Sequence, residues 1–133
     1  MENSFLQFKG KRIPYEISIN GDIMICVTEM AKIIGKYVSG FLRLKKTKKY
    51  VELYMGLNGI DSRSEFTPQG KLVKVVRGGE HNGTWMHESI ALKFASWLSM
   101  EFEIILYQEI RKIEKLNYKY KKRNQSINQQ PIN

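Results

Sequence analysis

The sequence predicts a small α+β domain, and three observations support this fold class. Residues 13–27 contain two short apolar runs around a glycine-containing turn, and in residues 72–87 a β-branched run enters such a turn and a Thr-Trp pair leaves it. Both patterns are typical of β-hairpins. Apolar residues recur at helical spacing between and after these two stretches. The chain has 133 residues, of which 42% are hydrophobic, so it can bury one core but hardly two.

The first hairpin is expected to pair residues 13–19 with residues 23–27. The first run alternates apolar and polar residues with the period of two that a half-buried strand requires. Asn20-Gly21-Asp22 lies between the two runs and provides a tight hairpin turn. Residues 5–9 are expected to add an edge strand to this hairpin.

A short helix is expected at residues 29–34, directly after the hairpin. Thr28 is suited to be its N-cap, because a threonine oxygen can accept a hydrogen bond from a free backbone N–H. Gly35 is suited to end the helix. The residues predicted to share its apolar face are Met30, Ile33 and Ile34.

A second helix is expected at residues 40–46, with Ser39 as its cap, and Thr47 is expected to cap a third segment that ends at Asn58. The apolar residues of the third segment are Tyr50, Val51, Tyr54 and Leu57. Two short helices joined by a tight turn, the second carrying Arg and Lys, are typical of a helix-turn-helix, here over about residues 28–46. Many small helical proteins contain this pattern without binding DNA.

The second hairpin is expected over about residues 72–87, after a polar stretch at 61–70 that is predicted to be a loop. Three glycines, at positions 78, 79 and 83, permit backbone angles that other residues avoid. The tip is therefore expected to be polar, flexible and exposed. In a basic chain such a tip can enter a groove of nucleic acid, or it can be only a loop.

Two helices are expected to follow the second hairpin, at about residues 88–98 and 100–116, with Ser99 as the cap between them. Trp97 is expected beside the buried face of the first of these helices. Beyond Leu116 the chain is rich in Tyr, Lys, Arg, Asn and Gln, so we expect the helix to fray into a disordered tail from about residue 120.

The net charge is +9, which indicates a polyanionic partner such as nucleic acid or a membrane surface. The excess lies in two places, residues 43–49, where five of seven residues are basic, and residues 111–123. No apolar run approaches the roughly 20 residues of a membrane span, and the first residues lack the pattern of a signal peptide. We therefore expect no membrane association and a cytoplasmic location inside a bacterial or infected host cell.

Cys26 is the only cysteine, so no disulfide can form within the chain, and its apolar neighbours predict a core position. The two histidines, His81 and His87, have no cysteine pair or carboxylate cluster near them in the sequence. They do not indicate a zinc site, and we expect His87 to cap or pack. The sequence therefore predicts no metal, no cofactor, no small-molecule substrate and no enzymatic activity.

Several motifs occur in an order that resembles a known DNA-binding family. They are Asn20-Gly21-Asp22, Val27 to Lys32, Gly35-Lys36, Ser39 to Arg43, Thr47 with Tyr50 and Val51, Gly78 to His87, Ala91, Phe94-Ala95, Trp97 to Ser99 and Glu101-Phe102. With them the chain resembles the KilA-N domain, a module of phage and large DNA-virus proteins that is related to the fungal APSES DNA-binding domain. Phe41 stands where the family usually has Trp. The motifs from Gly78 onward are the most specific part of this resemblance.

The resemblance covers about residues 12–113 and implies a compact DNA-binding domain of winged-helix type without catalytic activity. Residues 1–116 are then the domain, and residues 117–133 are a basic tail. In phage proteins another domain usually follows this module, whereas here only the short tail follows.

The function predicted from the residues and the resemblance is non-enzymatic, regulatory binding of double-stranded DNA. Arg43 is the best candidate for reading a base, because its planar fork can bond guanine at two points. The lysines that follow it are expected to hold phosphates, and the hairpin tip is expected to act as a wing. The complete set of expected DNA contacts is Thr28, Lys32, Lys36, Ser39, Arg43, Lys45, Lys46, Lys48, Lys49, Arg77, His81 and Asn82.

An alternative function is a protein-interaction module, such as an antirepressor that binds a repressor. The long last helix, about residues 100–116, can supply a partner surface or a homodimer seam, although its apolar stripe is only as wide as a core-facing helix needs. RNA binding is a weaker variant of the first function, because the aromatic residues follow core-like spacing.

Overall fold

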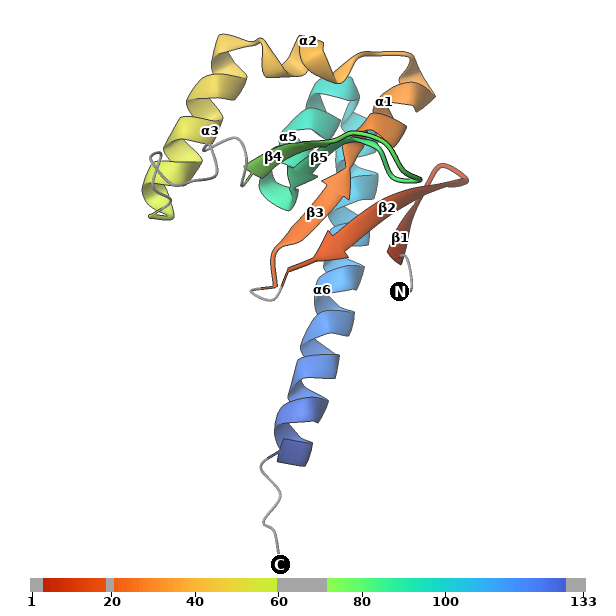
Figure 1. The fold of residues 1–133 in the computed structure, drawn as a ribbon, viewed down its shortest axis with the longest axis vertical. Coiled ribbons are helices and arrows are strands. Elements are labelled where there is room, and N and C mark those ends of the chain that lie inside the picture. Colours follow the sequence, from red (N-terminus) through yellow and green to blue (C-terminus); the bar gives the residue numbers. More distant parts are fainter. Residues whose placement is uncertain (1–3, 19–20, 60–71, 129–133) are drawn as a thin grey trace, which may run out of the picture.

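The computed structural model describes residues 4–18, 21–59 and 72–128, with side chains described up to Lys119 (Figure 1). Its strands are β1 Ser4–Phe8, β2 Lys11–Ile17, β3 Ile23–Cys26, β4 Val73–Val76 and β5 Gly83–His87. They form one antiparallel sheet in the order β1-β2-β3-β5-β4. The helices are α1 Val27–Ile34, α2 Val38–Leu42, α3 Lys45–Leu57, α5 Glu88–Leu98 and α6 Met100–Asn128. The predicted α+β class is confirmed.

The two hairpins join through their inner strands. β3 pairs with β5, with Ile25 opposite Met86 and Cys26 opposite Trp85. Both predicted hairpins are therefore present, but they are parts of a single sheet. The predicted edge strand pairs with β2 through a turn at Lys9 and Gly10. The predicted loop at 61–70, and Asn20 of the first turn, lie outside the described residues.

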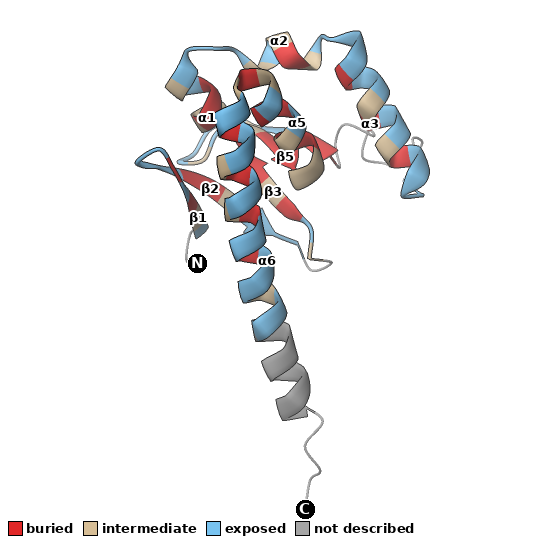
Figure 2. Cartoon of the chain, turned by 180° about the vertical axis from the view of Figure 1, so that it is seen from behind, coloured by how far each residue is buried: buried red, intermediate tan, exposed pale blue. Residues whose placement is uncertain are grey.

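The core lies between the sheet, α1, α5 and α6. Figure 2 shows that the buried residues of α6 lie in the part of the helix that crosses the sheet, and both α5 and α6 contact strands of the sheet. Phe8 of β1 and Phe102 of α6 meet edge to face at 4.7 Å between ring centroids. Trp85 is 2% exposed, and Cys26 is buried, as its apolar neighbours predicted. The other residues that are fully buried in this core include Ile13, Ile25, Met30, Met86, Ile90, Phe94 and Leu106.

The second predicted helix, 40–46, is wrong, because α2 ends at Leu42 and Lys45 begins α3. Leu44 separates them in an extended conformation, with φ −67° and ψ 136°. The physical reason is that both Phe41 and Thr47 are buried. Six residues apart, they would lie on different faces of one continuous helix, which turns about 100° per residue. The break at Leu44 lets both side chains reach the core.

The three predicted N-caps in this region are also wrong. The N-cap positions of α1, α2 and α3 are Cys26, Tyr37 and Leu44, and none of them donates or accepts a side-chain capping bond. Thr28, Ser39 and Thr47 instead lie inside the helices that they were expected to precede. The caps predicted at Gly35 and Ser99 are confirmed, since Gly35 has φ 77° and the Ser99 hydroxyl accepts a hydrogen bond from Phe102 N–H.

The last helix is longer than predicted. It continues to Asn128, whereas the sequence predicted fraying from about residue 120. The physical reason is that residues 117–128 contain no Gly or Pro and several strong helix formers, Lys, Arg and Gln. Among the described side chains the last buried one is Ile113. Beyond it α6 projects away from the sheet (Figure 1).

Candidate nucleic-acid interface

The densest group of positive charge lies on the first turns of α3. Lys45, Lys46, Lys48 and Lys49 are exposed there, and α3 has no acidic residue in its first turn and no side-chain cap. Within the described residues none of these lysines forms an ion pair. The N-terminus of a helix carries a partial positive charge, so cations are least favourable there. A bound anion would offset this charge and satisfy free backbone N–H groups.

Arg43 and Ser39 lie just before this group. Arg43 is the C-cap residue of α2 and is exposed. Its Nε donates a hydrogen bond to the backbone oxygen of Ser39, at 3.3 Å. This bond orients the side chain along α2 and uses the inner nitrogen. The two terminal nitrogens of the guanidinium are the ones that bidentate recognition requires.

Lys32 and Lys36, on and after α1, have partners within the chain. Lys32 Nζ lies 3.2 Å from Glu29 Oε1, an i,i+3 ion pair on the exposed side of α1. Lys36 Nζ lies over the Trp97 ring, 4.8 Å from its centroid. Both side chains remain exposed, but their charges are already engaged, unlike those at the start of α3.

The tip of the second hairpin is only partly as predicted. Arg77 and Asn82 are exposed, and Gly78 and Gly79 have φ of 80° and 84°. The prediction that His81 is exposed is wrong, because the residue is half-buried. Its ring packs against Phe5 at 5.8 Å, and its backbone oxygen accepts a hydrogen bond from Trp85 Nε1 at 3.0 Å.

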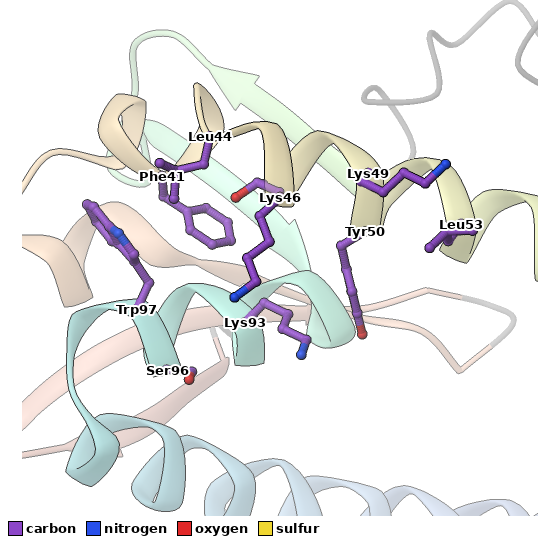
Figure 3. A pocket seen from close by; sticks show the side chains of 10 residues that line it. Phe41, Leu44, Lys46, Lys49, Tyr50, Leu53, Lys93, Ser96 and Trp97 are labelled. Carbon is purple, nitrogen blue, oxygen red and sulfur yellow. The ribbon is translucent and has the colours of Figure 1, made fainter.

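A mostly apolar groove lies between α3 and α5, with a volume of about 480 Å³ (Figure 3). We call it the α3/α5 groove. Lys46 from α3 and Lys93 from α5 extend toward the space between the two helices, whereas Lys49 points away from it. The apolar residues that line it are Phe41, Leu44, Tyr50, Leu53 and Trp97.

The predicted contact residues do not form one cluster. Figures 1 and 2 place α3 and the tip of the β4–β5 hairpin on opposite sides of the molecule. Ser39, Arg43 and the four lysines of α3 lie together on one side. Arg77, His81 and Asn82 form a separate group on the other side.

Comparison with protein families gives a match to the KilA-N domain over residues 8–116. The chain belongs to the KilA-N domain family. KilA-N domains are DNA-binding domains, so the chain belongs to a DNA-binding family. Comparisons with curated proteins and with solved structures gave no significant match.

In this KilA-N domain Thr28 joins α1 to the second hairpin. Its Oγ1 accepts a hydrogen bond from Thr84 N–H at 2.8 Å. Gly83 has φ 136°, and a Cβ at that position would lie 2.7 Å from the same oxygen. The hydroxyl of Thr28 is thus occupied by the end of the hairpin that lies next to its turn, which explains why small residues meet at this point.

Sequence reasoning missed a second basic turn beside the hairpin tip. Lys11 and Arg12 begin β2 and are exposed, and the Arg12 guanidinium lies 4.4 Å from the centroid of the Phe5 ring. Because Phe5 of β1 also contacts His81, the β1–β2 hairpin packs beside the tip of the β4–β5 hairpin. The Lys9-Gly10 pair was the available signal, since a turn there brings Lys11 and Arg12 to the end of a hairpin.

His87 has the capping role predicted for it. It is 6% exposed, and its Nδ1 accepts the Ser89 backbone N–H at the start of α5 and lies 2.8 Å from Ser89 Oγ. Its Nε2 lies 3.2 Å from Asp22 Oδ1, a pairing hidden in the sequence because the two residues are 65 positions apart. Among the described residues no group of three or more His, Cys, Asp or Glu is placed to hold a metal ion.

No helix in the described ranges is long and apolar enough to cross a membrane.

Proposed function

We propose that this KilA-N domain is a non-enzymatic, regulatory protein of phage or viral type that binds double-stranded DNA with sequence preference. The observation that carries the proposal is the uncompensated positive charge at the N-terminus of α3. Four lysines at the positive end of a helix dipole reduce the stability of the folded domain. Phosphate groups of DNA would reverse that effect, because they bind both lysine and free backbone N–H groups.

The proposed contact surface consists of a helix-turn-helix-like unit and a wing. The unit comprises α1, α2 and the start of α3, over about residues 28–46. Arg43 reads a base edge, the lysines of α3 hold phosphates, and Ser39, Lys32 and Lys36 flank them. The β4–β5 hairpin is the wing, where Arg77, His81 and Asn82 contact the backbone or minor groove at a separate place. We add Lys11 and Arg12 to that second group.

Titration of a random pool of DNA duplexes at two salt concentrations tests this proposal. Lys48→Ala should weaken binding to all sequences and reduce the slope of log K against log salt by about one. Arg43→Ala should relax the preference at one position of the selected site, at a cost of about 1–3 kcal/mol for the matched base. Lys74→Ala is the control, since Lys74 of β4 is paired with Glu16 of β2 and is not among the proposed contact residues.

Two results would contradict the proposal. The first is the absence of a shifted complex at low salt. The second is an equal loss of slope in Lys48→Ala and Lys74→Ala, which would mean that general charge, and not the surface of α3, carries the binding. Plasmid DNA incubated with the protein and magnesium should be recovered intact, and cleavage would overturn the non-enzymatic part.

A further inference from the structure

The apolar side chains that line the α3/α5 groove are not among the proposed DNA contacts. The floor of the groove is made by Phe41, Tyr50 and Trp97, and two leucines stand at its edge, Leu44 at 39% and Leu53 at 51% exposed. A duplex offers phosphates and base edges to a protein but little apolar surface that would fill such a groove. Exposed apolar side chains gathered in a concave site are typical of a surface that binds a partner.

The charges around the groove define the chemistry of its occupant. Lys46 and Lys93 extend toward its opening from the two helices, and none of the ten residues that line it is acidic. Lys93 Nζ lies 4.9 Å from the centroid of the Tyr50 ring, so a cation is held at the wall itself. A matching ligand therefore combines large apolar side chains with carboxylates on either side.

The distal part of α6 in a second copy of this chain does not fit that description. The exposed apolar residues of α6 beyond the core, Leu116 and Tyr118, lie in a segment whose charged residues are mainly Arg and Lys. Docking that segment in the groove would place its cations against Lys46 and Lys93. Like charges brought together in this way oppose association.

We infer that the α3/α5 groove binds an acidic amphipathic helix of a partner protein. Leucine or phenylalanine side chains at i, i+3 or i+4, and i+7 of that helix insert between Leu44, Leu53 and Trp97. Its Asp and Glu residues pair with Lys46 and Lys93. Where Lys46 also contacts DNA, as proposed above, the helix and DNA compete, and this consequence alone depends on the proposed function.

The test uses a synthetic peptide of about 18 residues, long enough to form a helix. The peptide is acetylated and amidated, contains Leu at these positions with Glu and Ala elsewhere, and lacks Trp and Tyr. Trp97 lines the groove whereas Trp85 is buried, so binding is expected to shift tryptophan emission to shorter wavelength. A scrambled peptide of the same composition is the control for charge alone.

Two matched pairs of variants on α3 locate the binding surface. Leu53→Ala should weaken peptide binding about tenfold, because it removes apolar contact area. Leu57 is 85% exposed and lies outside the groove, so Leu57→Ala should weaken peptide binding less than about twofold. Lys46→Glu should weaken binding about tenfold. Lys48→Glu changes net charge equally but does not line the groove, so it should have about a twofold effect.

Equal affinity for the scrambled peptide, or equal effects within either pair of variants, would overturn the inference. The inference would also be overturned if the peptide left the emission of Trp97 unchanged while an oligo(dT) strand shifted it, and if Leu53→Ala abolished the shift caused by the oligo(dT) strand. Duplex binding is measured separately without peptide, so failure of the groove to bind and failure to bind DNA are distinguishable.

Discussion

Glu88 begins α5 in surroundings that disfavour its charged form. Burial first, and then the nearby carboxylates of Glu114 and Asp22, together raise the pKa of its carboxyl group from 4.5 to about 7. Within the described residues its Oε2 is buried without a hydrogen-bond partner. The unfolded chain ionises Glu88 near pH 4.5, so the folded state loses stability as the pH rises from there to about 7.

Glu88→Gln should therefore increase the free energy of unfolding at pH 8 by about 1 kcal/mol, because it removes a charge that the folded state disfavours. Water screens part of the side chain and keeps the effect this small. At pH 4 the change should be near zero, since the carboxyl group is protonated in both states. Urea unfolding at the two pH values measures the difference. An equal effect at pH 4 and pH 8 would show that titration of Glu88 is not its cause.

Thr28 and His81 are two residues whose roles were predicted wrongly from the sequence. Each was assigned from its neighbours in the chain, Thr28 as a cap and His81 as an exposed tip residue. The Oγ1 of Thr28 bonds Thr84, 56 positions away, and the ring of His81 packs on Phe5. Contacts with distant residues outweighed local preference at both positions. His87 was predicted correctly because its capping bond goes to Ser89, two residues away.

The lysines in the first turn of helix α3 disfavour the folded helix but favour the binding of an anion. Its first turn carries lysines where acidic residues would favour the helix dipole. A surface selected only for folding would place Asp or Glu there. The observed charges are thus easiest to understand as contacts to an anion.

Lys45→Glu should separate these two effects. We expect it to increase the free energy of unfolding by about 0.5 kcal/mol at low salt, while it weakens DNA binding severalfold. Lys119→Glu is the charge-matched control, because Lys119 lies far from either end of α6 and should show no gain in stability. A loss of stability in Lys45→Glu would contradict the argument from the helix dipole.

The existence of α1, α5 and the two hairpins followed from periodicity and turn residues, but the boundary between α2 and α3 did not. Arg43 to Lys49 read as a continuation of one helix and a capped start of another. The break at Leu44 depends on where Phe41 and Thr47 find buried space, which for Phe41 lies against Phe94 and Trp97 of α5. Such a boundary is decided by packing and carries only a weak local signal.

The molecule as a whole has one core, and α6 extends past it. The pairing of β3 with β5 unites hairpins that are about 60 residues apart in sequence, and α5 and α6 cover the resulting sheet (Figure 2). Because Ile113 is the last buried side chain described, the second half of α6 adds length and charge to the molecule but no described core contact.

A chain ending at Leu116 should therefore unfold with a free energy within about 0.5 kcal/mol of the full chain, since surface changes away from the core have effects of this size. Its affinity for DNA should depend less steeply on salt if the basic residues of 117–133 add phosphate contacts. Urea unfolding and the salt titration measure the two effects. A loss of more than 2 kcal/mol would place part of the stable domain beyond Leu116.

The order of strands and helices, the excess of positive charge and the resemblance to the KilA-N family were all readable in the chain, because periodicity, turn residues and motif spacing are local properties. Folding decided which hairpins share a sheet, how Asp22 meets His87, and that the basic groups lie on opposite sides. It also created the α3/α5 groove from residues of α2, α3 and α5. These features depend on contacts between residues far apart in the chain, for which no local pattern provides a signal.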